Sequence, residues 1–369
     1  MPDVTEQDRA FMRRAIELAW NGWGRVAPNP MVGCVIVRDD GQVVGEGWHT
    51  EYGRPHAEVE ALRAAGDAAR GCTAYVSLEP CSHWGKTPPC TDALIAAGVR
   101  RVVFGGFDPN PKASGGASVL RAAGIEATGG VEEDAVRDQN HAFFHAHGPS
   151  SAERPLIALK LAMSLDARIA DRDGRSVWIT GAEARAETHR LRAGYDAIAV
   201  GIGTALADDP QLTVRGRVKP RVPPVRIVFD RALRLSPESK LVRSAREIPV
   251  WAVCEPNAPA DRCRALEDAG VRVIAGFGLD DQLCAIREAG VRSMFVEGGA
   301  VLASTLLTAD VVDRMYLFYA PVLIGPGGMA PFGGIASPAL ADARRWRHVA
   351  TQAFGADTLV TLEGPHPLA

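Results

Sequence analysis

The chain predicts an α/β protein of two domains, and three observations support this. Its 369 residues exceed what one hydrophobic core needs. Short apolar runs typical of buried strands alternate with helically spaced segments along the whole length. The stretch HAHGPSSAERP, between His145 and Pro155, has no periodicity and interrupts this alternation. We therefore expect a first domain over residues 1–147, a linker over 148–155 and a second domain over 156–369.

In the first domain, each expected element follows from periodicity and turn residues. Apolar residues at helical spacing predict a helix over 8–20. The runs at 31–37 and 42–48 predict a hairpin around the turn Asp39-Asp40-Gly41. Helices and strands then alternate, which favours parallel pairing in the later part of the sheet. We expect these helices at 56–66, 90–98 and 116–124, and these strands at 73–78 and 100–106.

The second domain restarts with an apolar run at 155–170, which predicts a strand. A helix is expected over 181–194. Further strands are expected at 197–201, 225–230, 250–254, 271–276, 293–299 and 315–325. The two domains share an architecture but no motif, so we identify no internal repeat.

Composition excludes several classes of function. The formal net charge is −3 without a basic block, which argues against a nucleic-acid partner. The first twenty residues are charged and amphipathic, so no signal peptide is predicted, and no apolar run is long enough to span a membrane. We expect a cytoplasmic protein without a membrane partner.

Seven scattered cysteines do not form a disulfide framework.

Two of these cysteines lie in the loop EPCSHWGKTPPC, where they could form a disulfide, bind a metal or act as small apolar side chains. His56 opens a predicted helix, Cys81 follows a strand and Cys90 begins another helix. One imidazole and two thiolates suit Zn²⁺ with a position left for water. Glu58 completes the deaminase signature H-x-E followed by P-C-x-x-C, although here eight residues separate the cysteines.

The chemistry of such a site is hydrolytic deamination. Zinc lowers the pKa of a bound water to about 7, which activates it for attack on an amidine-like ring carbon. Glu58 would take the water proton and pass it to the ring nitrogen and the leaving amine. A closed structural site would need a fourth ligand. Cys34 and Cys72 are candidates, but we interpret both as core residues because they lie in or beside apolar strands.

Taken together, these motifs resemble the bacterial bifunctional deaminase–reductase family of riboflavin biosynthesis. The resemblance covers nearly the whole chain in the family's order, and the long cysteine loop fits this family better than nucleoside or RNA deaminases. It is carried by the segments 27–37, 55–62, 79–90, 108–111, 160–170, 177–181, 191–215 and 296–299.

For the first domain, the resemblance implies a cytidine-deaminase-like α/β/α sandwich. It places one Zn²⁺ per chain on His56, Cys81 and Cys90, with Glu58 as the proton shuttle. The implied reaction is deamination of 2,5-diamino-6-ribosylamino-4(3H)-pyrimidinone 5′-phosphate. The implied substrate contacts are Asn29, His49, His83, Lys86, Asp108 and Asn110.

For the second domain, the resemblance implies a dihydrofolate-reductase-like α/β fold that uses NADPH to reduce the ribosyl group to ribityl, giving 5-amino-6-ribitylaminouracil 5′-phosphate. The residues themselves show no G-x-G-x-x-G motif, but two Gly-rich turns follow strands and can bind phosphate through backbone N–H groups. The implied substrate contacts are Lys160, Ser176, Arg192, Leu212, Arg215 and Glu297. The implied cofactor contacts are Ala162, Trp178, Thr204, Asp208, Gly299, Ala300, Val301, Leu302, Ala303, Ser304 and Thr305.

Ala167 departs from the family pattern, which usually has glycine after the aspartate of SLDGR. If this position requires a positive φ, the backbone would be strained with alanine there.

We also expect the protein to form a homo-oligomer.

Two other functions stay open at this stage. A nucleoside or tRNA deaminase with an appended nucleotide-binding domain would share the zinc site but predicts a basic face. A non-catalytic, zinc-stabilised binding protein predicts four protein ligands.

Overall fold

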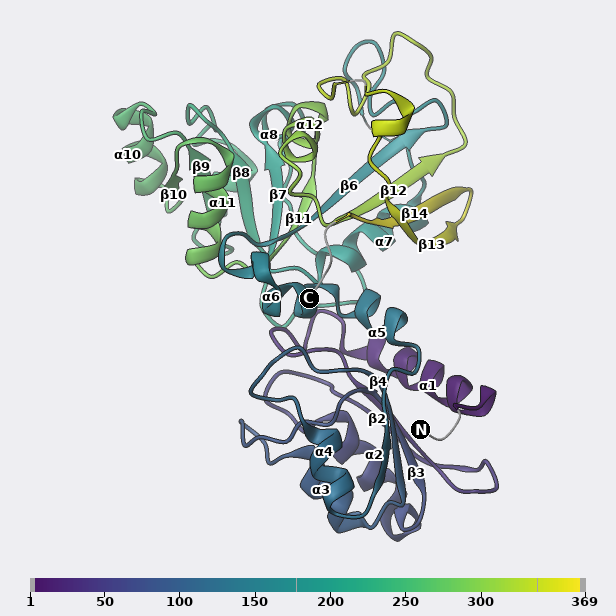
Figure 1. The fold of residues 1–369 in the computed structure, drawn as a ribbon. Coiled ribbons are helices and arrows are strands. Elements are labelled where there is room, and N and C mark those ends of the chain that lie inside the picture. Colours follow the sequence, from purple (N-terminus) through teal and green to yellow (C-terminus); the bar gives the residue numbers. More distant parts are fainter. Residues whose placement is uncertain (1–3, 177, 337, 366–369) are drawn as a thin grey trace. The chain divides into compact units, whose positions relative to one another are not determined.

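The computed structural model describes residues 4–365 except 177 and 337. The chain divides into two compact units between Pro149 and Ser150. This division lies inside the stretch 148–155, where a single 3₁₀ turn spans Pro149–Ala152. Each unit contains one sheet (Figure 1).

The first unit is built on a five-stranded sheet in the order β2-β1-β3-β4-β5. The predicted hairpin is confirmed, because β1 and β2 pair antiparallel. The strand β1 also pairs antiparallel with β3, whereas β3, β4 and β5 are parallel, as the helix–strand alternation predicts. The strands are β1 (Gly33–Val37), β2 (Val43–Trp48), β3 (Thr73–Leu78), β4 (Arg101–Gly106) and β5 (Glu126–Thr128).

Helices cover both faces of this sheet, which makes a three-layer α/β/α sandwich. Successive side chains of a strand point to opposite faces. Val35 and Val37 accordingly pack in one cluster with α1, α5 and α6, while Cys34 and Ile36 pack in another with α2, α3 and α4. The helices are α1 (Glu6–Ala19), α2 (Ala57–Ala65), α3 (Cys90–Ala97), α4 (Gly116–Ala122), α5 (Glu133–Gln139) and α6 (His141–His147).

Asp8 is a buried carboxylate that ties α1 to the sheet. It accepts hydrogen bonds from the Arg101 guanidinium at 2.7 Å and the Tyr75 hydroxyl at 2.9 Å, and it also accepts from Thr5 in a capping box. Burial alone would raise the pKa of Asp8, but the hydrogen bonds from Arg101, Thr5 and Tyr75 lower it to about 2. Asp8 therefore favours the folded state when it is ionised.

We expect Asp8→Asn to lower the free energy of unfolding of the first domain by about 2 kcal/mol at pH 7. The folded pKa lies below the unfolded value of about 3.9, so this contribution is complete above about pH 5 and disappears as the pH falls towards 2. Urea unfolding at several pH values would measure it. Asp39→Asn, which removes an exposed ion pair with Arg100, is the control and should change stability by less than about 1 kcal/mol. An equal loss at pH 7 and pH 2.5 for Asp8→Asn would contradict this linkage.

The second unit contains a nine-stranded sheet in the order β10-β9-β8-β7-β11-β6-β12-β14-β13. The strands from β10 to β12 are all parallel, and the C-terminal hairpin β13–β14 extends the sheet in antiparallel fashion. These strands are β6 (Leu156–Ser164), β7 (Ala197–Gly201), β8 (Val225–Phe229), β9 (Val250–Cys254), β10 (Arg272–Ala275), β11 (Ser293–Glu297), β12 (Arg314–Ala320), β13 (Arg347–Phe354) and β14 (Asp357–Glu363).

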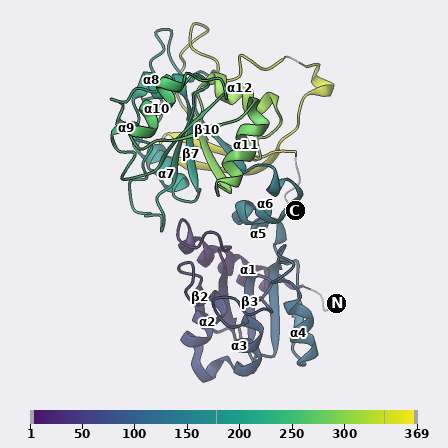
Figure 2. The same cartoon turned by 90° about the vertical axis from the view of Figure 1, so that its left-hand side faces the viewer.

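Helices again lie on both faces of the sheet. The helices α11 and α12 pack in one apolar cluster, and α8, α9 and α10 pack in the other (Figure 2). These helices are α7 (Ala182–Arg192), α8 (Ile202–Asp208), α9 (Lys240–Arg243), α10 (Ala260–Asp268), α11 (Gly278–Glu288) and α12 (Ala300–Thr308). Within the described part of the chain, no helix has the length and apolar character needed to cross a bilayer.

The predicted strand over 155–170 is wrong in its second half, because β6 ends at Ser164. A turn follows, in which the Asp166 carboxylate accepts from the Ser164 hydroxyl at 2.7 Å and from the backbone of Ile324 and Gly325. Ala167 lies in this turn with φ of +53°, in the left-handed region that favours glycine. The departure from the family pattern therefore falls at a position where alanine is strained.

We expect Ala167→Gly to stabilise the second domain modestly. A left-handed conformation costs a residue with a side chain roughly 1–2 kcal/mol, and the greater chain entropy of glycine offsets about half of this. The net gain should be about 0.5–1 kcal/mol, measurable as a rise in urea midpoint. Ala158→Gly in the middle of β6 is the control and should destabilise. A loss of stability on Ala167→Gly would show that the methyl group's packing against the core outweighs the backbone strain.

Candidate active sites

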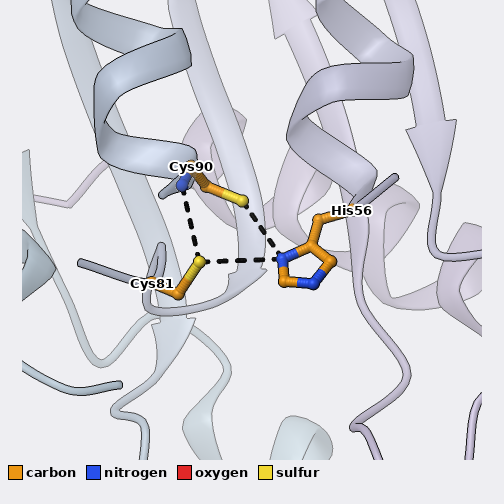
Figure 3. Close-up of side chains that lie close together, drawn as sticks. All are labelled: His56, Cys81 and Cys90. Atoms are coloured by element: carbon orange, nitrogen blue, oxygen red, sulfur yellow. Dashed lines mark hydrogen bonds between the residues drawn. The ribbon is translucent and has the colours of Figure 1, made fainter. Parts of the chain in front are cut away.

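Three potential metal ligands meet at one edge of the first sheet. His56 immediately precedes α2, Cys90 is the first residue of α3, and Cys81 lies in the loop after β3 (Figure 3). The His56 Nδ1 atom lies 3.2 Å from the Cys90 sulfur and 3.6 Å from the Cys81 sulfur. All three ligand atoms lie within 4.8 Å of one another. Elements distant in sequence thus bring one nitrogen and two sulfurs together.

The donor set fits zinc. A hydrogen bond from the Cys90 side chain, with further help from His56, lowers the pKa of the Cys81 thiol to about 4. The Cys90 backbone N–H also donates to the Cys81 sulfur at 3.4 Å. Thiolate and neutral imidazole are the forms that bind zinc. The second ring nitrogen of His56 lies 3.4 Å from the Thr87 hydroxyl, which helps to orient the ring.

The geometry supports neither a disulfide between Cys81 and Cys90 nor a closed zinc site with Cys34 or Cys72 as a fourth ligand. Cys81 and Cys90 are free thiols rather than a disulfide. Cys34 is fully buried in an apolar cluster of β1, and the Cys72 thiol donates to the Ala68 carbonyl at 3.0 Å. Neither belongs to the metal-binding group found among the described residues. Three protein ligands leave a position for water or substrate.

Glu58 lies in the first turn of α2 and is 3% exposed. Burial raises the pKa of its carboxyl group. Its Oε2 atom has no hydrogen-bond partner among the described residues, which is unusual for a buried oxygen. Glu58 also lines the cavity that contains His56 and Cys81. A carboxylate oxygen beside the ligand cluster is therefore available to a bound molecule.

The cavity has a volume of about 260 Å³ and brings the predicted substrate contacts of the first domain together. They come from the segment before β1, from β2–α2, and from the loops after β3 and β4. The predicted residues among its lining are Asn29, His49, His83, Lys86, Asp108 and Asn110.

The surroundings of two of these polar groups, His49 and Asp108, shift their pKa values. The His49 Nδ1 atom lies 3.1 Å from the Pro55 carbonyl, so it carries the proton, and Nε2 accepts from the Asn29 amide at 3.3 Å. Burial lowers the pKa of His49, which keeps the ring neutral. Burial raises the pKa of Asp108 to about 6, and the negative charge of Glu79 adds to this shift. The cavity therefore offers both hydrogen-bond donors and acceptors, as recognition of a pyrimidine edge requires.

The structure adds cavity residues that the sequence reasoning missed. Lys86 Nζ lies 4.2 Å from the centre of the Tyr52 ring, and Arg54, on the loop before α2, also lines the cavity. The Glu79 carboxylate accepts from the backbone of Asp108 and Ala117 and so joins two loops of the site. The closeness of residues 52–54 to His56 in the sequence could have indicated that they line the same cavity. Other lining residues that the sequence reasoning did not single out include Thr87 and Phe143.

In the second domain, charged residues gather where β11 and α7 end beside the middle of β6. Glu297 lies opposite Lys160 in the parallel pairing of β11 with β6. The Arg192 guanidinium at the end of α7 donates to the Glu297 carboxylate and, at 2.8 Å, to the Thr213 carbonyl. Burial alone would raise the pKa of Glu297, but Arg192 and Lys160 lower it to about 2. The structure therefore assembles three predicted substrate contacts into one partly exposed cluster.

The two Gly-rich turns also meet. The turns from β7 to α8 and from β11 to α12 follow adjacent parallel strands. A Cβ atom on Gly299 would lie 3.1 Å from the Thr204 hydroxyl, so these turns are in contact. Gly299 precedes α12, which contains the predicted cofactor residues 300–305. Exposed N–H groups at such helix starts suit phosphate binding.

The remaining predicted residues of this domain lie on several elements. Asp208 ends α8, and Ala162 lies on β6 opposite Phe318. Leu212 is buried at a φ of +50°, and Arg215 is exposed. Ser176 is half-buried before residue 177, whereas Trp178 is 72% exposed with its ring 4.4 Å from the Arg185 guanidinium.

Fold and site together define a two-domain α/β enzyme whose first domain carries a zinc-binding deaminase site. Residues 5–106 match the family profile of the cytidine and deoxycytidylate deaminase zinc-binding region, and residues 155–360 match that of the RibD C-terminal domain. The chain belongs to the RibD family of riboflavin biosynthesis proteins, which combine a pyrimidine deaminase with a reductase.

Relatives support this assignment along the whole chain. The chain is 42% identical to riboflavin biosynthesis protein RibD of Aquifex aeolicus, over 88% of this chain and 90% of that protein. It is 40% identical to RibD of Escherichia coli, over 97% of this chain and 100% of that protein.

Solved structures agree. RibD of Acinetobacter baumannii (form 1) is 37% identical with a TM-score of 0.82, over 98% of this chain and 99% of that one. A second solved structure, from Thermotoga maritima, is a diaminohydroxyphosphoribosylaminopyrimidine deaminase/5-amino-6-(5-phosphoribosylamino)uracil reductase. It is 36% identical with a TM-score of 0.81, over 97% of this chain and 99% of that one.

Proposed function

We propose that the first domain deaminates 2,5-diamino-6-ribosylamino-4(3H)-pyrimidinone 5′-phosphate and that the second uses NADPH to reduce the ribosyl group of the product to ribityl. The observation that carries the first step is the Glu58 Oε2 atom, which has no hydrogen-bond partner in the described part of the chain and lies in a cavity that also contains His56 and Cys81. The names of the Thermotoga maritima relative's two activities support the choice of substrates.

In the deaminase site, His56, Cys81 and Cys90 would hold zinc, which would acidify and polarise a water. Glu58 accepts one proton from this water and delivers it to the pyrimidine ring nitrogen as the C–O bond forms. It then takes the second proton from the added hydroxyl and delivers it to the amine, which leaves as ammonia while the C–N bond breaks and the carbonyl forms. Asn29, His49, Asp108 and Asn110 bind the pyrimidine edge. His83 and Lys86 bind the phosphate, with Lys86 placed over the Tyr52 ring.

In the reductase site, NADPH would supply the hydride for the sugar C1′ atom of the ring-opened imine, whose nitrogen takes up a proton from water to give the amine. The turns around Thr204 and Gly299 bind the cofactor phosphates through backbone N–H groups. Arg192 and Arg215 bind the substrate phosphate, and Glu297 orients Arg192. The half-buried Lys160, whose pKa is lowered by desolvation, contacts the ribose. The contacts expected of Ala162, Ser176, Trp178, Asp208, Leu212 and residues 300–305 belong to this proposal.

The assay uses purified zinc-loaded protein and the diaminopyrimidine phosphate. Ammonia release should occur without NADPH, and NADPH oxidation should follow in proportion to deaminated product. No ammonia release, or a chelator-resistant release, would contradict the zinc mechanism. Steeply salt-dependent binding of tRNA would instead favour the tRNA deaminase alternative.

We further propose that the protein acts as a homo-oligomer in the cytoplasm. The exposed side chains of Leu323 and Leu340 are candidate contacts, being 73% and 79% exposed. Sedimentation equilibrium showing a monomer at micromolar concentration would contradict the oligomer.

A further inference from the structure

His189 lies in the last turns of α7, one turn before Arg192, and contacts both arginines of the proposed phosphate site. Its Nδ1 atom lies 3.2 Å from the backbone nitrogen of Arg215 and 3.4 Å from Nη1 of Arg192. The first contact crosses from α7 to the segment after Leu212. No motif in the sequence pointed to this histidine.

The chemical state of His189 follows from its partners. A backbone N–H and a guanidinium are both donors and have no acceptor capacity. The Nδ1 atom must therefore present its lone pair, and the proton of the neutral ring lies on Nε2. A proton on Nδ1 would face two donors. Burial and the charges of Arg192 and Arg215 lower the pKa of His189 to about 4, which agrees with a neutral ring.

A neutral acceptor has a specific advantage at this position. A carboxylate would hold the same two donors, but it would cancel the positive charge that a phosphate dianion needs. Arg192 already forms an ion pair with Glu297. A second acidic partner would leave the site with little attraction for an anion. A neutral imidazole holds the same two donors in place and leaves the positive charge of the arginines available to the phosphate.

We propose that His189 is a positioning residue that, as a neutral hydrogen-bond acceptor, holds Arg192 and the Arg215 backbone together and so shapes the binding site for the phosphate of the reductase substrate. This inference rests on the proposed function, because it assumes that these two arginines bind that phosphate. It predicts a role in substrate affinity rather than in hydride transfer.

The experiment compares three substitutions of His189 in the full-length enzyme, with the deaminated pyrimidine phosphate as the reductase substrate. His189→Leu removes the acceptor and should raise the reductase KM for this substrate roughly tenfold with little change in kcat. His189→Asn places an amide oxygen near the position of Nδ1 and should restore most of the affinity. His189→Asp keeps the acceptor but cancels charge, so its KM should rise as for leucine. The KM for NADPH and the deaminase rate should stay at wild-type values in all three variants.

Nitrogen NMR of the imidazole tests the chemical state that the proposal requires, while the separation of KM from kcat distinguishes positioning from a purely structural role. The wild-type ring should be the Nε2–H tautomer at neutral pH, and an Nδ1–H tautomer or a charged ring would overturn the proposal. A wild-type KM in His189→Leu would do the same, as would failure of His189→Asn to restore affinity in a folded protein.

Arg215→Ala separates the inference from the function on which it rests. If Arg215→Ala raises the KM and His189→Leu does not, only the role of His189 is wrong. If Arg192→Lys and Arg215→Ala both keep a wild-type KM, the phosphate assignment itself is wrong and the inference falls with it.

Discussion

Replacing Glu58 by glutamine is expected to lower the rate of ammonia release by roughly 10²–10⁴-fold, the usual contribution of a positioned general base. Glutamine matches glutamate in size and still fits the buried site at the start of α2, but it cannot take a proton from water. The Glu58 Oε2 atom has no partner among the described residues, so this substitution breaks no observed hydrogen bond to that atom. The loss should therefore be one of chemistry rather than folding.

The measurement is the initial rate of ammonia release from the diaminopyrimidine phosphate, together with zinc content by elemental analysis. Zinc should stay at one ion per chain in Glu58→Gln, because glutamate is not among the three ligands. Glu60→Gln on the same helix is the matched control, since Glu60 forms a surface ion pair with Arg63 and does not line the cavity that contains Glu58, within the described residues. Reductase activity on deaminated substrate should be unchanged in both variants. A deaminase rate near wild type in Glu58→Gln would show that another group moves the proton.

The metal site could be predicted from sequence because each ligand marks the end of a regular element. His56 and Cys90 begin helices and Cys81 follows a strand, and all these boundaries carry local signals in Pro, Gly and apolar periodicity. Elements that alternate along a parallel sheet have equivalent ends at the same edge. The sequence therefore carries both the ligand types and the reason why they meet.

Other parts of the structure have no comparable local signal. The strand β13 reads RHVATQAF and is largely exposed at the sheet edge, so it lacks the apolar alternation that marks half-buried strands. The short helices α5 and α6 follow one another directly and were not predicted. The ends of β6 and β12 came earlier than expected because apolar residues continue into turns that the Asp166 carboxylate holds.

The polar cluster of the second domain could not be predicted from local sequence either. Lys160 and Glu297 are neighbours only because β11 lies beside β6 in the sheet, and strand order is not readable from either segment alone. The resemblance to a known family supplied these residues, whereas periodicity did not. His189 and Tyr52 were missed for the same reason, since their roles depend on contacts between elements.

Replacing Glu297 by alanine is expected to abolish measurable reductase activity and to destabilise the second domain. Glu297 forms an ion pair with the largely buried Arg192 guanidinium, and it lies opposite Lys160 on the neighbouring strand, whose charge also lowers its pKa. Removing one member of a buried ion pair costs about 3–5 kcal/mol, because the remaining charge is left uncompensated. Arg192 would also lose the partner that orients it towards Thr213 and the proposed phosphate site.

Two controls separate the loss of charge from the loss of size. Glu288→Ala at the end of α11 removes an exposed carboxylate and should leave activity and stability unchanged. Glu297→Gln keeps an acceptor for Arg192 but not the charge, so we expect partial stability and a large loss of reductase rate. The deaminase rate should stay at the wild-type value in all three variants, which would show that the first domain remains folded.

The pH dependence tests whether the charge of Glu297 is responsible. Because Arg192 and Lys160 overcome the effect of burial and hold its pKa at about 2, below the unfolded value of about 4.3, the carboxylate stabilises the folded state fully above roughly pH 5. This contribution falls as the pH drops towards 2. The stability difference between wild type and Glu297→Gln in urea should therefore shrink on acidification. A constant difference would mean that packing around Glu297, and not its charge, holds the cluster together.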